Sequence, residues 1–151
     1  MTIQSHTVRH GGYNLHVVTA GSESAPPFLL LHCWNGNWSQ WETTIQHLGD
    51  RFHFIAPDHL GFGGSDKPTG DFYQITHQAE RTYYLLRHFG YDRAIVMGHS
   101  MGGMIGLTLA GMMPSAVEKL IVVAPAVTGK LHPFAKIATL VYPIVRQNIS
   151  F

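Results

Sequence analysis

Four short apolar runs alternate with longer segments of helical spacing along this chain, and this alternation constrains the fold more than any other feature. The runs cover residues 28–32, 52–58, 94–97 and 120–124. Continuous apolar runs of this length, bounded by turn residues, are typical of strands buried on both faces of a parallel sheet. The segments between the runs have the apolar spacing of helices, which we place at residues 38–48, 74–89 and 101–112. We therefore predict an α/β fold, with a mostly parallel sheet and helices on both of its faces.

An antiparallel hairpin is expected ahead of the first buried strand. Residues 6–20 alternate between apolar and polar side chains around Gly11 and Gly12, which is the pattern of two strands joined by a tight turn. With 151 residues the chain has room for one domain, or part of one. No internal repeat or low-complexity segment divides it.

The composition indicates a globular chain and excludes several kinds of partner. Hydrophobic residues make up 45% and charged residues 13%, which argues against disorder. The net charge is only +1, with 10 basic and 9 acidic residues spread along the chain, so we expect neither nucleic acid nor a membrane as a partner. Cys33 is the only cysteine and the first residues lack the apolar core of a secretory signal, so a cytoplasmic location is expected. The 11 histidines fall in no metal-binding spacing, and we expect no metal and no organic cofactor.

The most specific motif is Gly98-His99-Ser100-Met101-Gly102, which lies between a predicted buried strand and a predicted helix. A Gly-x-Ser-x-Gly sequence in this setting indicates a nucleophile elbow, a sharp turn that exposes the serine hydroxyl at the C-terminal edge of the sheet. Glycine is needed on both sides because side chains two residues from the serine would collide with neighbouring elements. The alternative is an ordinary strand-to-helix turn with the serine at the helix N-cap.

A second motif, His32-Cys33-Trp34-Asn35-Gly36, directly follows the first buried strand. Backbone N–H groups placed there and facing the serine would stabilise the oxyanion of an acyl-transfer reaction. The expected donors are the amides of Trp34 and Met101. The alternative is a hydrophobic loop around a histidine that is already hydrogen-bonded.

These two motifs and a glycine-rich loop at residues 57–68 resemble the α/β-hydrolase superfamily, in the branch of esterases, haloperoxidase-like enzymes and related small-molecule hydrolases. The motifs occur in the family's order, and the resemblance extends from the hairpin to the strand at residues 120–124. It implies that Ser100 is the nucleophile, and that Asp58 and Asp66 in the glycine-rich loop are turn and capping residues. The other motif residues support the site: His32, Gly36, Gly98, His99 and Gly102.

The chain departs from the family pattern at two places. The family's order is serine, acid, histidine, but only Glu118 and His132 follow Ser100 as an acid and a histidine. The resemblance thus implies that residues 1–128 are the N-terminal part of the core, truncated after the sixth strand, and that residues 129–151 begin the lid. The chain would then be a truncated gene product, a fragment, or one half of a pair whose partner is a complementing C-terminal half, and alone it would be very slow or inactive. The second departure is Cys33, where the family usually has glycine, and a cysteine there could narrow the oxyanion loop.

The resemblance predicts hydrolysis of a small, fairly apolar ester or related acyl substrate through an acyl-serine intermediate. Haloalkane dehalogenases and epoxide hydrolases have a similar pattern but carry aspartate at the position of Ser100, so the serine argues against them. Carbon–carbon bond hydrolases remain an alternative. So does a non-catalytic ligand-binding protein on the same fold, because a fold does not dictate a function. A dinucleotide-binding domain is disfavoured, because Ser100 stands where its glycine fingerprint needs glycine.

Overall fold

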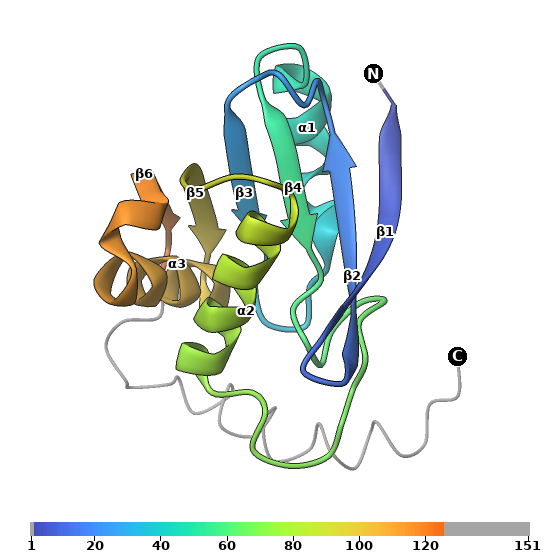
Figure 1. Ribbon diagram of the computed structural model, residues 1–151, viewed down its shortest axis with the longest axis vertical. Coiled ribbons are helices and arrows are strands. Elements are labelled where there is room, and N and C mark those ends of the chain that lie inside the picture. The colour runs from blue at the N-terminus through green and yellow to red at the C-terminus, as the bar shows by residue number, and fades with distance from the viewer. Residues whose placement is uncertain (1, 126–151) are drawn as a thin grey trace.

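The computed structural model describes residues 2–125 and contains a six-stranded sheet in the order β1-β2-β4-β3-β5-β6 (Figure 1). The β1/β2 and β2/β4 pairs are antiparallel, and the β4/β3, β3/β5 and β5/β6 pairs are parallel. The strands are β1 (Ile3–His10), β2 (Tyr13–Ala20), β3 (Pro27–Leu31), β4 (His53–Pro57), β5 (Ala94–His99) and β6 (Val117–Val123). The predicted hairpin and the mostly parallel sheet are confirmed.

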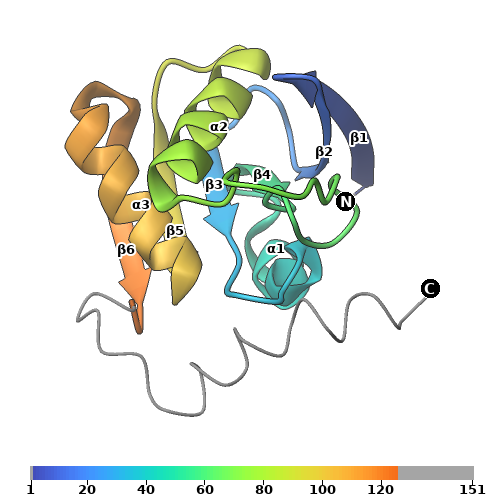
Figure 2. The same ribbon diagram turned by 90° about the horizontal axis from the view of Figure 1, so that it is seen from below.

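Helices cover both faces of the sheet, as predicted (Figure 2). The α-helices are α1 (Glu42–Leu48), α2 (Ile75–His88) and α3 (Met101–Met112), and two 3-10 helices are η1 (Trp38–Trp41) and η2 (Pro114–Ala116). Side chains of β3 alternate between two cores because successive strand residues point to opposite faces. Leu29 and Leu31 pack with residues of α2 and α3, whereas Phe28 and Leu30 pack with Trp41 and Ile45 at α1.

Several element boundaries differ from the prediction by one to four residues, and two of the differences have an identifiable cause. The helix expected over residues 38–48 begins as the 3-10 turn η1, where the side chain of Asn37 accepts a hydrogen bond from the Ser39 N–H at 2.8 Å. The last strand begins at Val117 rather than at Leu120, because it pairs along the full length of β5 after a register shift at its start. The segment expected to begin the lid, residues 129–151, lies outside the described residues.

The C-terminal ends of β3, β4 and β5 meet at one edge of the sheet, because these strands are parallel (Figure 1). The chain leaves that edge through the loops that carry the three sequence motifs. In open α/β sheets, ligands bind outside the carboxyl ends of the strands. This edge is therefore where a site would be expected.

Candidate active site

Ser100 occupies the turn between β5 and α3 with a backbone of φ 53° and ψ −112°. A positive φ is uncommon for a residue that carries a Cβ atom, and it persists only where surrounding structure holds it. Here the Ser100 N–H donates to the carbonyl of Val123 at 2.9 Å, and its carbonyl accepts from the Met104 N–H at 3.1 Å. The end of β6 and the first turn of α3 therefore fix the conformation of this serine.

The two glycines of the motif are required by close backbone contacts. A Cβ atom on Gly102 would lie 2.7 Å from the carbonyl oxygen of His32 and closer still to that of Leu31. A Cβ atom on Gly98 would lie 2.6 Å from the Gly103 nitrogen and closer still to the Gly102 oxygen. Backbone atoms cannot rotate away as side chains do, so no larger residue fits at either position.

The alternative of a capping serine does not hold, because the Ser100 side chain makes no capping hydrogen bond to α3. The hydroxyl is therefore not engaged in holding the helix. Ser100 is half-buried at the sheet edge, between the buried Met101 and the partly exposed His99. This arrangement has the features of a nucleophile elbow.

The loop expected to hold an oxyanion lies directly beside this elbow. Gly102 meets the carbonyls of Leu31 and His32, so the start of α3 packs against the start of the loop. Met101 is the first residue of α3, where backbone N–H groups have no acceptor within the helix. The structure thus brings the segments that contain Trp34 and Met101 to one place.

The loop itself is a tight turn. The Gly36 N–H donates to the Cys33 carbonyl at 3.1 Å, and Asn35 has a φ of 57°, which asparagine tolerates better than most residues. The Cys33 N–H is taken by the Gln40 side chain at 3.0 Å. A Cβ atom on Gly36 would lie 3.2 Å from the sulfur of Cys33, so the cysteine leaves little space above this turn.

His32 is a neutral imidazole that orients the loop at residues 33–36 through its hydrogen bonds. It is fully buried, its Nδ1 lies 2.7 Å from the Cys33 carbonyl, and its Nε2 accepts from the His59 N–H at 2.9 Å. These partners assign the proton to Nδ1, which donates to the carbonyl. Burial lowers the pKa of His32, although the hydrogen bond to Cys33 and the charge of Asp58 oppose the shift. The alternative for this motif, taken from the sequence, is a loop around a histidine that is already hydrogen-bonded. That description of His32 is correct, since both of its ring nitrogens have partners.

His59 lies against His32, and its importance was not anticipated from the sequence. The two imidazole rings are 4.4 Å apart, and the Nε2 of His59 is buried with no hydrogen-bond partner among residues 2–125. Burial lowers the pKa of His59 well below 6.5, and the neighbouring His32 lowers it further. Its position directly after Asp58 at a strand end was the only sequence signal.

Asp58 holds the glycine-rich loop together. Its Oδ1 accepts from the Trp38 N–H at 2.7 Å, and its Oδ2 accepts from the Gly64 N–H and lies 2.8 Å from Nδ1 of His16. Asp66 accepts from the Asn14 N–H at 2.8 Å. Both carboxylates thus tie together distant backbone segments, as expected of turn residues. The partner His16 was not anticipated.

A base and an orienting acid for Ser100 are not found among residues 2–125. No histidine there hydrogen-bonds the Ser100 side chain, and Glu118 instead pairs with Arg93 at 3.3 Å. His132 lies outside the described residues.

Within the described part of the chain, no three His, Cys, Asp or Glu side chains gather in a way that could hold a metal ion. None of the helices described is long and apolar enough to cross a bilayer.

Comparison with known proteins identifies the fold. A family model described as the alpha/beta hydrolase fold matches residues 26–148. The chain belongs to the alpha/beta hydrolase fold family. Among curated relatives of this alpha/beta hydrolase, the soluble epoxide hydrolase of Corynebacterium sp. (strain C12) is 38% identical over 120 residues, which are 80% of the chain and 41% of the relative. The AB hydrolase superfamily protein YfhM of Bacillus subtilis (strain 168) is 36% identical over 93% of the chain and 49% of its own length.

A solved structure has the same architecture. The epoxide hydrolase CorEH without ligand superposes on this alpha/beta hydrolase with a TM-score of 0.79 and 33% identity, covering 95% of this chain and 50% of the other. The chain thus spans about half the length, or less, of the relatives that it matches.

Proposed function

We propose that this chain carries the nucleophile of a serine hydrolase that acts on small, fairly apolar esters or related acyl compounds. The observation that carries the proposal is the strained backbone of Ser100, held between two glycines whose Cβ positions are filled by neighbouring backbone atoms. Strain of this kind persists only where the surrounding structure imposes it, and it clusters at functional sites. In this conformation the serine would present its oxygen at the edge of the sheet.

The proposed reaction uses the residues as follows. The Oγ of Ser100 attacks the acyl carbon, its proton passes to a base, and the carbonyl oxygen becomes an oxyanion. Amides of Trp34 and Met101 stabilise that oxyanion, with His32 positioning the loop that contains Trp34. Collapse of the intermediate expels the alcohol and leaves an acyl-serine, which water then hydrolyses.

The base and the acid would come from a segment beyond residues 2–125. The relatives continue for about as much length again, since the chain covers only 41% and 49% of the two described above. Glu118 lies at the start of β6, beside the start of β5, whereas Ser100 follows the other end of β5, so we do not assign Glu118 as the acid. We assign both roles to a segment equivalent to the second half of the relatives, either continuous with this chain or supplied as a complementing partner.

The chemistry of serine favours an acyl substrate over the epoxide that the names of two matches would suggest. Attack of a serine oxygen on an epoxide carbon would leave an ether, which water does not readily cleave. Attack on an acyl carbon leaves an ester, which a second attack by water can resolve. A serine at position 100 can therefore complete a catalytic cycle on an ester but not on an epoxide.

A fluorophosphonate probe tests the nucleophile, since it labels serines of hydrolases covalently. The purified chain would be labelled with and without added imidazole, which can substitute for a missing histidine base, and the labelled residue mapped by mass spectrometry. We expect slow labelling at Ser100 that imidazole accelerates, none in Ser100→Ala, and no change in Ser39→Ala, a control at an exposed serine.

Substrate class is tested with p-nitrophenyl butyrate and styrene oxide under the same conditions. We expect imidazole-dependent ester hydrolysis above the Ser100→Ala background, and no loss of the epoxide. Equal labelling of Ser100→Ala would overturn the nucleophile, and turnover of styrene oxide that depends on Ser100 would overturn the substrate class. Ligand binding without any labelling would favour the non-catalytic alternative.

A further inference from the structure

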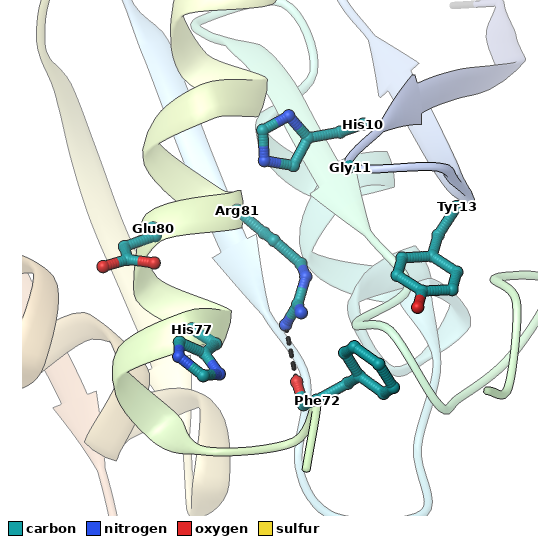
Figure 3. Close-up of a pocket in the computed structure, with 7 residues that line it drawn as sticks. All are labelled: His10, Gly11, Tyr13, Phe72, His77, Glu80 and Arg81. Carbon is teal, nitrogen blue, oxygen red and sulfur yellow. Dashed lines mark hydrogen bonds between the residues drawn. The ribbon is translucent and has the colours of Figure 1, made fainter. Parts of the chain in front are cut away.

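A concave site lies between the β1–β2 hairpin and the first half of α2 (Figure 3). It is a surface pocket of about 240 Å³. Its lining consists of His10, Gly11, Tyr13, Phe72, His77, Glu80 and Arg81, and includes no residue of the elbow or of the oxyanion loop. Pockets for drug-sized ligands are usually larger, roughly 300–1,000 Å³, so this one suits a small molecule.

The central group of this pocket is the guanidinium of Arg81, which has no carboxylate partner among residues 2–125. Its Nη1 donates to the Phe72 carbonyl at 2.8 Å and lies 3.5 Å from the Gln78 side-chain oxygen. Within the described chain, no hydrogen bond engages its Nε or Nη2. Burial lowers the pKa of Arg81, yet arginine remains charged in proteins. The partly buried guanidinium of Arg81 therefore has two nitrogens, Nε and Nη2, without a hydrogen-bond partner among residues 2–125.

The other groups around the guanidinium offer hydrogen bonds, and the one carboxylate in the lining is Glu80, whose charge opposes the lowering of the Arg81 pKa. Figure 3 shows His10 and Tyr13 on the hairpin side of Arg81, whereas the carboxylate of Glu80 points away from it. Burial and the positive charge of Arg81 both lower the pKa of His10. The Nδ1 of His77, also in the lining, is buried without a hydrogen-bond partner in the described part of the chain. The pocket therefore holds positive charge and unused hydrogen-bonding capacity.

The remaining walls are aromatic. Tyr13 and Phe72 meet edge to face with ring centroids 5.2 Å apart, and the His10 ring stacks on Tyr84 at 3.8 Å. An apolar group attached to the anion would pack against these rings. The two oxygens of a planar carboxylate can accept two parallel hydrogen bonds from the Nε and Nη2 of a guanidinium. A compact spherical anion cannot accept both with the same geometry.

We propose that this pocket binds a small organic carboxylate, clasped by the Nε–Nη2 edge of Arg81 and flanked by Tyr13 and Phe72. The site is independent of Ser100, so it would be a ligand site additional to the hydrolase site.

The test uses benzoate as the probe, with uncharged benzamide and inorganic phosphate for comparison, and isothermal titration of the 151-residue chain as the measurement. We expect benzoate to bind saturably and at least tenfold more tightly than benzamide or phosphate. Arg81→Gln should weaken benzoate about 10- to 100-fold, because a charge-assisted pair is lost. Arg81→Lys should weaken it less, and Glu80→Gln should strengthen it. Arg87→Gln is the matched control on α2, since Arg87 is exposed and paired with Asp92, and it should leave affinity within twofold.

A second measurement uses the unsubstituted chain, so it tests the proposal even if Arg81→Gln does not fold. Phenylglyoxal modifies accessible arginines, and benzoate should protect Arg81, but not Arg87, when the modified peptides are quantified by mass spectrometry. The proposal is overturned if benzoate binds no better than benzamide, or if neither Arg81→Gln nor benzoate protection involves Arg81. Tighter Arg81-dependent binding of phosphate would overturn the preference for a carboxylate.

Discussion

The packing of α3 at the elbow can be tested with one substitution made at three glycines of the same helix. Gly102, Gly106 and Gly111 all lie within α3, and each would be replaced by alanine. An added Cβ at Gly102 would press on the backbone carbonyls of Leu31 and His32. At Gly106 it would lie 3.0 Å from a methyl group of Leu120, and at Gly111 it would meet nothing within 4 Å.

The expected changes in the free energy of unfolding follow from these distances. Alanine in place of glycine stabilises a helix interior by about 0.5–1 kcal/mol, a gain that applies in full at Gly106 and only in part at Gly102 and Gly111, which lie in the first and last turns of α3. Overpacking costs about 1–3 kcal/mol where side chains can adjust, and more where the obstacle is backbone. We therefore expect Gly111→Ala to stabilise by up to about 0.5 kcal/mol. Gly106→Ala should be near neutral, and Gly102→Ala should destabilise by roughly 2 kcal/mol or more.

Urea unfolding followed by circular dichroism measures these differences, provided that the dependence on urea concentration stays the same across the variants. The three variants share the same chemical change and the same helix, so a difference among them reports the local surroundings. Equal stabilities for Gly102→Ala and Gly111→Ala would refute the argument that backbone contacts impose glycine at the elbow.

Three further predictions concern residues that hold the fold around the site. Asp58→Asn should destabilise by about 2–4 kcal/mol because the buried carboxylate serves three donors, whereas the less buried Asp66→Asn should cost about 1 kcal/mol or less, and thermal unfolding compares them. Tyr91→Phe removes the hydroxyl group that accepts from Nδ1 of the buried His53 and donates to the Glu23 carbonyl, and should cost about 1 kcal/mol in urea unfolding, while an unchanged midpoint would contradict this. The free energy of unfolding should fall as the pH drops from 6.5 toward 5, because the unfolded chain takes up a proton that the buried His59, with its lowered pKa, refuses. Urea unfolding across that range should show up to about 1.4 kcal/mol per pH unit from this residue, and His59→Asn should flatten the slope by that amount.

Much of the fold was predictable because its signals are local. The apolar runs and the helical spacing determine which segments are buried on two faces and which on one, and these patterns repeat within a few residues. The helix at Met101–Met112 was predicted with its observed bounds, and the Gly11-Gly12 turn marked the hairpin. The boundary errors arose where tertiary contacts decided the outcome, since the start of β6 depends on pairing with β5.

The candidate site was predictable to a similar degree. The spacing of Gly98, Ser100 and Gly102 indicated a strained turn, and the structure has that turn. The sequence did not indicate that the ring Nε2 of His59, beside His32, is buried without a hydrogen-bond partner among residues 2–125, or that the Gln40 side chain accepts from the Cys33 N–H. Neither contact leaves a periodic trace in the sequence, because the first joins two loops that are 27 positions apart and the second depends on the local path of one loop.

The sequence by itself thus determined the strands, the helices and the identity of the residue at the elbow, since these depend on local sterics and on side-chain periodicity. Only the tertiary structure decided which atoms crowd Gly98 and Gly102, which groups bind Asp58, and that Arg81 lines a pocket with its Nε and Nη2 unpaired among residues 2–125. The reason is physical. His16 and Asp58 are 42 positions apart, and the hairpin and α2 meet at Arg81 only because the sheet order places them together.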